Sequence, residues 1–124
     1  VYYVQYAHAR IHSIFRKLEI ADPAACSATP AQLALLTAPE ERELIRHLSG
    51  LEKTVVECAK ALDPSCITRY ALELATLFHK FYNACHVSGV DADLAAARLA
   101  LCDATRIALR NVLTMMKIDA PESM

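Results

Sequence analysis

This chain of 124 residues has little glycine, no tryptophan and almost no net charge. It contains two glycines and no tryptophan, while 55% of its residues are hydrophobic and 22% are charged, with a formal net charge of −1. The low glycine content argues against an all-β fold with many tight turns, and the high hydrophobic fraction excludes a disordered segment. Alanine and leucine, which favour helix, occupy 22 and 16 positions. The composition predicts one soluble, all-α domain spanning residues 1–124.

Motifs for catalysis, secretion and membrane insertion are missing as well. The two glycines lie too far apart for a phosphate-binding loop, and neither HExxH nor GxSxG occurs. The longest uncharged run, residues 23–39, holds three prolines, which excludes a membrane helix. No basic and apolar leader opens the chain, which starts at Val1 without a helix cap. We expect a cytoplasmic fragment of a larger protein, inactive alone, monomeric, with no membrane or DNA partner.

The cysteines are odd in number and irregularly spaced, at Cys26, Cys58, Cys66, Cys85 and Cys102. They form no C-x-x-C pair, and a domain of this length needs no disulfide framework. We expect five reduced, mostly buried thiols. A zinc site built from cysteines and histidines of different helices is the alternative, but ligand pairs at short spacing are missing, so no metal ligand is assigned.

Apolar spacing predicts a compact bundle of about five helices. These are a first helix ending near Leu18, then helices over residues 40–50, 51–62, 66–85 and about 91–115, with a linker at 20–39 and a non-helical tail at 118–124. Thr37 and Glu40 have the spacing of a capping box, and Pro39 suits a first turn. Glu40, Glu41 and Glu43 are interpreted as a solvated helix start, where acids favour the helix dipole.

The first helix has one apolar stripe and one polar face. The stripe consists of Tyr3, Ala7, Ile11, Ile14 and Leu18, and the polar face of Gln5, His8, His12 and Arg16. The two histidines could share a metal, but a polar contact surface is favoured because no third ligand is near. Residues 1–18 hold three basic residues and no acid, so any nucleic-acid contact uses a few placed groups rather than a broad basic face.

Two features suit RNA binding. At the end of the helix over 66–85, Tyr82, Asn83 and His86 can offer stacking and base-edge contacts, although ordinary helix-end packing explains them equally well. On the last helix, Arg106 and Arg110 form a positive ridge able to meet phosphates, and Arg98 lies on the same helix. Pairing of Arg106 with Asp103, at i,i+3 spacing, is the structural alternative.

Four segments resemble arginyl-tRNA synthetases. Residues 3–11 read YVQYAHARI and are followed by SIFRK at 13–17; residues 78–87 read FHKFYNACHV, residues 97–106 read ARLALCDATR, and the chain ends in APESM. The third segment resembles the motif after which the DALR anticodon-binding domain is named, with Thr105 in place of its leucine. The four segments occur in the order that they have in that family, and they are spread from one end of the chain to the other.

The resemblance implies a helical C-terminal domain that binds the anticodon region of arginine tRNA. It implies tRNA contacts by Tyr82, Asn83, His86, Arg98, Arg106, Arg110 and Met124. It also implies that Tyr2, Tyr3, Gln5 and His8 face the catalytic domain, which is absent here. Arginine activation with ATP and Mg²⁺ would belong to that upstream domain, and no cofactor to this fragment. Met124 would be the native terminus.

Two alternatives stay open. One is a helical bundle that binds only proteins, through the apolar surface of the first helix. The other is the anticodon-binding domain of another class I synthetase, such as a cysteinyl or methionyl enzyme, against which the YVQYAHAR and terminal PExM segments argue.

Overall fold

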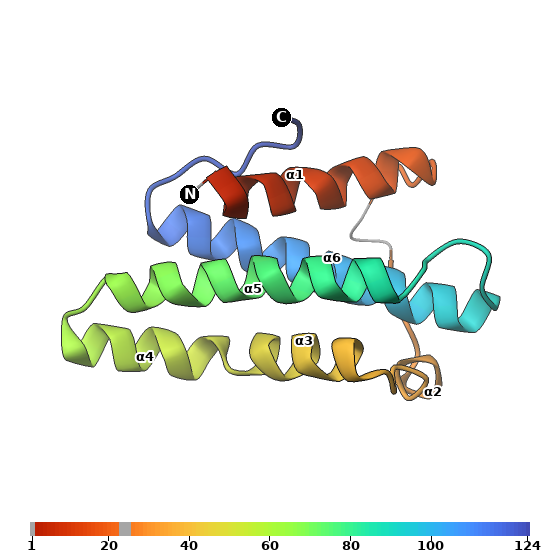
Figure 1. Ribbon diagram of the computed structural model, residues 1–124, viewed down its shortest axis with the longest axis horizontal. Helices are drawn as coiled ribbons and strands as arrows, with labels where there is room; N and C mark the ends of the chain where they lie inside the picture. The colour runs from red at the N-terminus through yellow and green to blue at the C-terminus, as the bar shows by residue number, and fades with distance from the viewer. Residues whose placement is uncertain (1, 23–25) are drawn as a thin grey trace.

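The computed structural model describes residues 2–22 and 26–124, and within them the backbone forms six α-helices and no strand. The helices are α1 (Tyr2–Lys17), α2 (Pro30–Leu33), α3 (Pro39–Ser49), α4 (Leu51–Ala61), α5 (Ser65–Ala84) and α6 (Ala92–Met115). The long helices α5 and α6 pack together, α3 and α4 run roughly end to end along α5, and α1 packs on α5 and α6 (Figure 1). The all-α prediction is confirmed, with one more short helix than expected.

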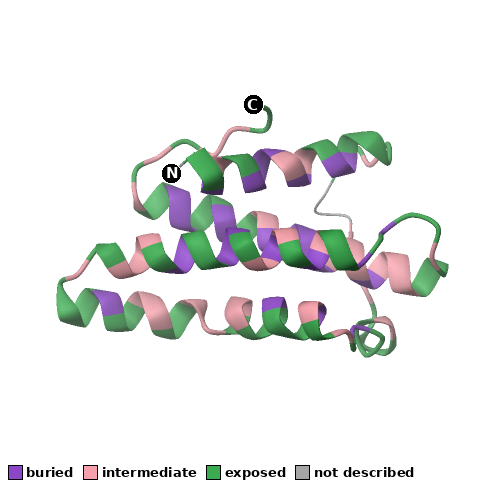
Figure 2. Cartoon of the chain, in the orientation of Figure 1, coloured by how far each residue is buried: buried purple, intermediate pink, exposed green. Residues whose placement is uncertain are grey.

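The core lies between the inward faces of these helices, as the burial colours of Figure 2 show. Its largest fully buried side chains include Phe15 from α1, Phe78 and Phe81 from α5, and Leu109 and Leu113 from α6. Burying one such side chain contributes about 1.5–3 kcal/mol relative to leaving it exposed. Helix α5 therefore holds the fold together from the middle, and α1 is anchored to it by its own apolar face.

The predicted faces of α1 need correction. Ala7, Ile11 and Ile14 are buried as expected, but Tyr3 is exposed. His8, assigned to the polar face, is only 2% exposed. The non-helical tail after α6 explains its burial, because the tail crosses α1 on the side that the sequence pattern leaves open (Figure 1).

Two helix starts also differ from the prediction. The segment expected to be a linker contains α2, which begins at Pro30 and is capped by reciprocal hydrogen bonds between Thr29 and Gln32. Pro23, another proline of that segment, lies outside the described residues. No capping box forms between Thr37 and Glu40: the backbone N–H of Ala38 donates instead to Oε1 of Glu41, at 3.0 Å. Pro39 does occupy the first turn, as predicted.

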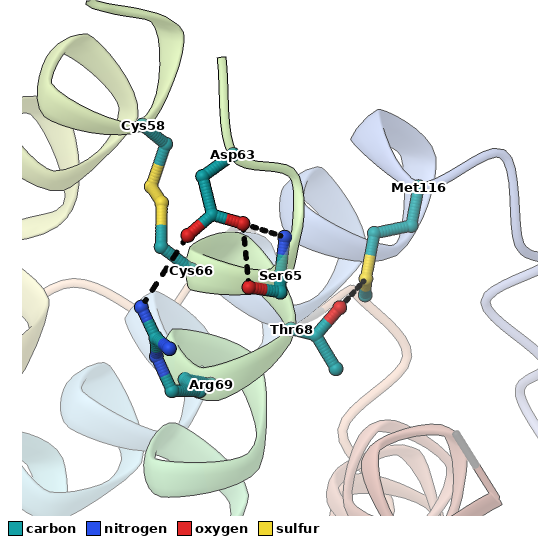
Figure 3. The surroundings of a disulfide bond; sticks show 7 residues. All are labelled: Cys58, Asp63, Ser65, Cys66, Thr68, Arg69 and Met116. Atoms are coloured by element: carbon teal, nitrogen blue, oxygen red, sulfur yellow. Dashed lines mark hydrogen bonds and ion pairs between the residues drawn. A yellow bond between two sulfur atoms is a disulfide. The ribbon is translucent and has the colours of Figure 1, made fainter. Parts of the chain in front are cut away.

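The expectation of five reduced thiols is wrong for one pair, because a disulfide joins Cys58 to Cys66 (Figure 3). The turn between α4 and α5 brings the two residues, eight positions apart in sequence, to a Cα–Cα distance of 5.9 Å. Asp63 stabilises this turn by accepting hydrogen bonds from the backbone N–H and hydroxyl of Ser65. The spacing of Cys58 and Cys66 in the sequence does not by itself reveal that the chain reverses and brings the two helix ends together.

The other three cysteines are free. Cys85 and Cys102 are buried and Cys26 is half-buried. Burial raises the pKa of the Cys102 thiol to about 12, so this side chain behaves as a small apolar group. Within the residues that the structure describes, no helix is both long enough and apolar enough to cross a bilayer.

Candidate nucleic-acid interface

The outer face of α1 carries large side chains that the core does not cover. Tyr2 is 79% exposed, Tyr6 is 50% exposed and Tyr3 is 43% exposed. The rings of Tyr3 and Tyr6 both contact the ring of His79 on α5, with centroids 5.3 and 5.8 Å apart. One side of each tyrosine is thus fixed by α5 while the other faces solvent.

Arg10 connects this face of α1 to the end of α5. Its Nη1 donates a hydrogen bond to Nδ1 of His79 at 2.9 Å, and its guanidinium carbon lies 5.1 Å from the centroid of the Tyr82 ring. Burial, and then the charge of Arg10, lower the pKa of His79, which keeps its imidazole neutral and able to accept. Tyr82 also stacks on the buried ring of Phe78, at 6.0 Å. We call this the α1–α5 aromatic surface: Tyr3, Tyr6, Arg10, His79 and Tyr82.

The tail after α6 is held on α1 through its backbone. Gln5 Nε2 donates to the carbonyl oxygen of Asp119 at 2.9 Å, and Arg16 Nη1 donates to that of Glu122 at 3.0 Å. Between them, Nδ1 of His8 lies 2.8 Å from the carbonyl oxygen of Pro121. A carbonyl can only accept, so His8 carries a proton on Nδ1.

Two depressions lie on α1, and the end of this tail lines one of them. One, of about 200 Å³, is lined by Tyr6, Ala9, Arg10, Ser13 and Met124, and we call it the Met124 pocket. The other, of about 550 Å³, is lined by Arg10, Ser13, Ile14, Arg16, Lys17 and Tyr82, and we call it the basic cleft. They share Arg10 and Ser13, so they adjoin. Together they place an apolar pocket with an aromatic wall beside a cleft with three cationic side chains.

This combination is typical of surfaces that bind single-stranded RNA, where rings stack on bases and nearby cations contact phosphates. The comparisons with known proteins agree with that chemistry. Residues 4–124 match the family described as the DALR anticodon binding domain. The chain belongs to the DALR anticodon-binding domain family.

The relatives of this DALR domain are arginine–tRNA ligases. Those of Ruminiclostridium cellulolyticum and Moorella thermoacetica are 50% and 48% identical to it over all 124 residues, which span 22% of each relative. The solved arginyl-tRNA synthetase of Thermus thermophilus has 33% sequence identity and a TM-score of 0.82, covering 98% of this chain and 21% of that one. The family resemblance and the fold predicted from it are confirmed.

The DALR domain brings only some of the predicted tRNA contacts together. Tyr82 lies in the aromatic surface and Met124, 68% exposed, lines the adjoining pocket. Asn83 and His86 are exposed near the end of α5. The backbone carbonyl of His86 accepts a hydrogen bond from Nη1 of Arg98 at 2.6 Å, which leaves the imidazole of His86 to solvent.

The three arginines of α6 have different surroundings. Arg98 donates from Nε to Glu41 at 2.9 Å. Arg106 pairs with Asp103 at 2.7 Å, which is the structural alternative considered for it. Arg110 is exposed, and it lines a depression of about 480 Å³ with Arg106 and Lys117.

The interpretation of Glu41 as a solvated helix-start residue is wrong, because its side chain is 1% exposed. Its two oxygens are both used: Oε1 accepts from Ala38 and Oε2 accepts from Arg98. Helix α6 supplies the missing partner from 57 positions away. Among the described residues, no group of three or more histidine, cysteine or acidic side chains could hold a metal ion.

Three residues of the aromatic surface were missed as site candidates: Tyr6, Arg10 and His79. A signal for two of them exists in the sequence. Tyr6 follows Tyr3 by three positions, so the two rings share a helix face, and Arg10 continues that face one turn later. The basic first 18 residues pointed to the same helix.

Proposed function

We propose that this chain binds the anticodon region of arginine tRNA. The observation that carries the proposal is the α1–α5 aromatic surface, which adjoins both the Met124 pocket and the basic cleft. Tyr2, Tyr3 and Tyr6 are exposed together on one helix, and contiguous exposed apolar side chains mark a surface that another molecule can cover. Unpaired bases of an RNA loop have the flat faces and the adjacent phosphates that such a surface accommodates.

Each part of the surface has its own proposed contact. An unpaired base enters the Met124 pocket against the ring of Tyr6, and a neighbouring base stacks near Tyr82. Lys17, exposed in the basic cleft, meets a phosphate. Asn83 and His86 extend the contact at the end of α5, where an exposed amide and imidazole can read base edges.

The last helix contributes less to the proposed RNA contact. Arg110 is exposed and free to meet a phosphate. The pairing of Arg106 with Asp103 and that of Arg98 with Glu41 favour structural roles for these two arginines.

The rest of the protein belongs to the same proposal. We infer that this domain serves a cytoplasmic, monomeric enzyme that attaches arginine to its tRNA, with ATP and Mg²⁺ used by a catalytic domain outside this chain. Tyr2 and Tyr3 are exposed at the start of α1 and suit a contact with that domain. Gln5 and His8 donate to the tail and are less available for it.

The experiment that tests the proposal measures binding of this chain to an arginine tRNA transcript and to a transcript altered at the middle anticodon base, at two salt concentrations. We expect tighter binding to the unaltered transcript and weaker binding at higher salt, because phosphate contacts release counterions. Equal affinity for the two transcripts would contradict base recognition here. Salt-independent binding of a protein, without RNA binding, would favour the protein-interaction alternative.

A further inference from the structure

We infer that Gln5, His8 and Arg16 are positioning residues that clasp the tail to α1 and thereby build one wall of the Met124 pocket. This inference rests on the proposed function, since it assigns to the clasp a share of the recognition of RNA bases. It concerns side chains that touch the tail and not the RNA. Their effect on RNA is therefore indirect and is made through Met124.

The clasp acts on the backbone of the tail and so fixes its position without using its side chains. Its three donors accompany the tail over four residues, at the carbonyls of Asp119, Pro121 and Glu122. Bonds of this kind set the register of an extended segment, in the way that ladder bonds set the register of a strand. The last anchored carbonyl lies two residues before Met124. The terminal side chain is consequently held near α1 while it stays 68% exposed.

Arg16 couples the tail directly to the pocket. One of its terminal nitrogens donates to the carbonyl of Glu122, and the other donates to the hydroxyl of Ser13 at 2.9 Å. Ser13 itself lines the Met124 pocket. One planar guanidinium therefore fixes a wall residue of the pocket and the segment that carries Met124 at the same time.

His8 is the buried member of the clasp. Burial of its imidazole is favourable because the tail supplies a hydrogen-bond acceptor for it. The tail carbonyl satisfies Nδ1, whereas Nε2 is buried without a hydrogen-bond partner among the described residues. An unsatisfied buried polar atom is costly, so a leucine here would serve the core better. A histidine is favoured at this position if the bond to the Pro121 carbonyl is needed.

The test removes the donor of His8 while the helix is kept. His8→Leu retains an apolar side chain of similar size without a donor, and His8→Asn restores a donor near the position of Nδ1. His12→Leu is the matched control one turn along the same helix: it removes the ring that contacts the His8 ring at 4.8 Å and leaves the hydrogen bond between His8 and the tail. Gln5→Met provides a second way to weaken the clasp at a half-buried site, where misfolding is less of a danger.

The first readout is release of Met124 by carboxypeptidase, which needs an undocked tail and no RNA. We expect release about fivefold faster in His8→Leu, near the parent rate in His8→Asn and His12→Leu, and several times faster in Gln5→Met, since each change removes one hydrogen bond that holds the tail. Helical content by circular dichroism confirms that each variant is folded. Unchanged release in both His8→Leu and Gln5→Met would overturn the clasp.

The second readout is the ratio of affinities for the two transcripts. We expect His8→Leu to lower this ratio about fivefold or more, and to have no further effect in a chain that lacks residues 119–124, because His8 acts only through the tail. Faster release with an unchanged ratio would overturn the role of the clasp in base recognition. Failure of the parent chain to prefer either transcript contradicts the proposed function, and the carboxypeptidase result then decides the clasp alone.

Discussion

Two regions of the molecule differ in where their polar and aromatic groups find partners. One is the contact between α3 and α6, and the other is the outer face of α1. At the α3–α6 contact, both oxygens of Glu41 accept hydrogen bonds, and Arg98 donates to Glu41 and to the carbonyl of His86. At the outer face of α1, Tyr6 is half exposed in the Met124 pocket and Lys17 is exposed in the basic cleft. Groups whose partners are all inside the fold stabilise it, whereas the exposed ring and cation of α1 are available to another molecule.

The strongest way to test this comparison is to break the internal pair. Arg98→Leu leaves the Glu41 carboxylate buried and unpaired, which should lower the free energy of unfolding by about 3–5 kcal/mol in urea denaturation. Arg98→Met combined with Glu41→Gln removes both charges, keeps an acceptor for the Ala38 N–H, and should recover most of that loss. If Arg98→Leu left stability unchanged but abolished RNA binding, Arg98 would belong with the interface and the comparison would fail.

Removing a ring from α1 should have the reverse pattern. Tyr6→Ala should weaken binding to the arginine tRNA transcript by about 1–3 kcal/mol, or roughly 5- to 150-fold, because a base loses its stacking partner. Its effect on unfolding should be small, since one side of the ring faces solvent.

Two variants serve as controls for the ring. Tyr6→Phe keeps it and should bind like the parent chain. Tyr2→Ala removes an exposed ring at the start of the helix, outside the pocket, and should change RNA affinity little. Equal losses for Tyr6→Ala and Tyr2→Ala would show that α1 offers only general apolar surface.

A smaller effect is expected from single cations. Lys17→Gln should reduce the slope of log affinity against log salt by about 0.7, the contribution of one phosphate contact on a single strand. Lys53→Gln makes the same charge change on α4, at an exposed side chain that pairs with Glu57. It should leave the slope unchanged. Equal changes in the two variants would mean that net charge, and not the basic cleft, sets the salt dependence.

Local sequence pattern was sufficient for most of the fold and failed where distant segments meet. The periodicity of apolar residues gave α3 to α6 to within a few residues, because those helices bury one stripe each. It misplaced Glu41 and His8, whose partners Arg98 and Pro121 lie 57 and 113 positions away. Both side chains look like ordinary surface residues until the fold supplies a hydrogen-bond partner that makes burial favourable.

The candidate site divides in the same way. Tyr82 became a candidate through the residue types at the helix end and Met124 through the family resemblance. Their neighbours Arg10 and His79 come from two helices whose contact no spacing rule describes. Tyr6 was within reach, since it shares a face with Tyr3. The positions of the long helices are therefore predictable here, and the assembly of a site from α1, α5 and the tail is not.

The smallest expected effect is the loss of stability at lower pH. It distinguishes the α1 face, where His8 is buried, from the α3 side of the molecule. Burial is the main cause that lowers the pKa of His8, His12 and His79 from 6.5. Around His8, the charges of Arg106 and Arg110 act in the same direction, and the Pro121 hydrogen bond and Glu122 oppose them. A histidine whose pKa is lowered by folding binds its proton more readily when unfolded. Its neutral form therefore stabilises the fold fully above pH 6.5, and this contribution is lost as the pH falls below that value toward the folded-state pKa.

Urea denaturation at pH 7.5 and 5.5 should accordingly show a lower free energy of unfolding at the lower pH. Carboxypeptidase should release Met124 faster there, because a charged His8 would bury a second, unpartnered N–H. In His8→Asn, which has no titrating group at this position, both differences should shrink, whereas His47→Gln on the α3–α5 side should leave tail release as pH-dependent as in the parent. A tail released equally fast at both pH values would place the pH dependence elsewhere and remove His8 from the groups that distinguish the α1 face.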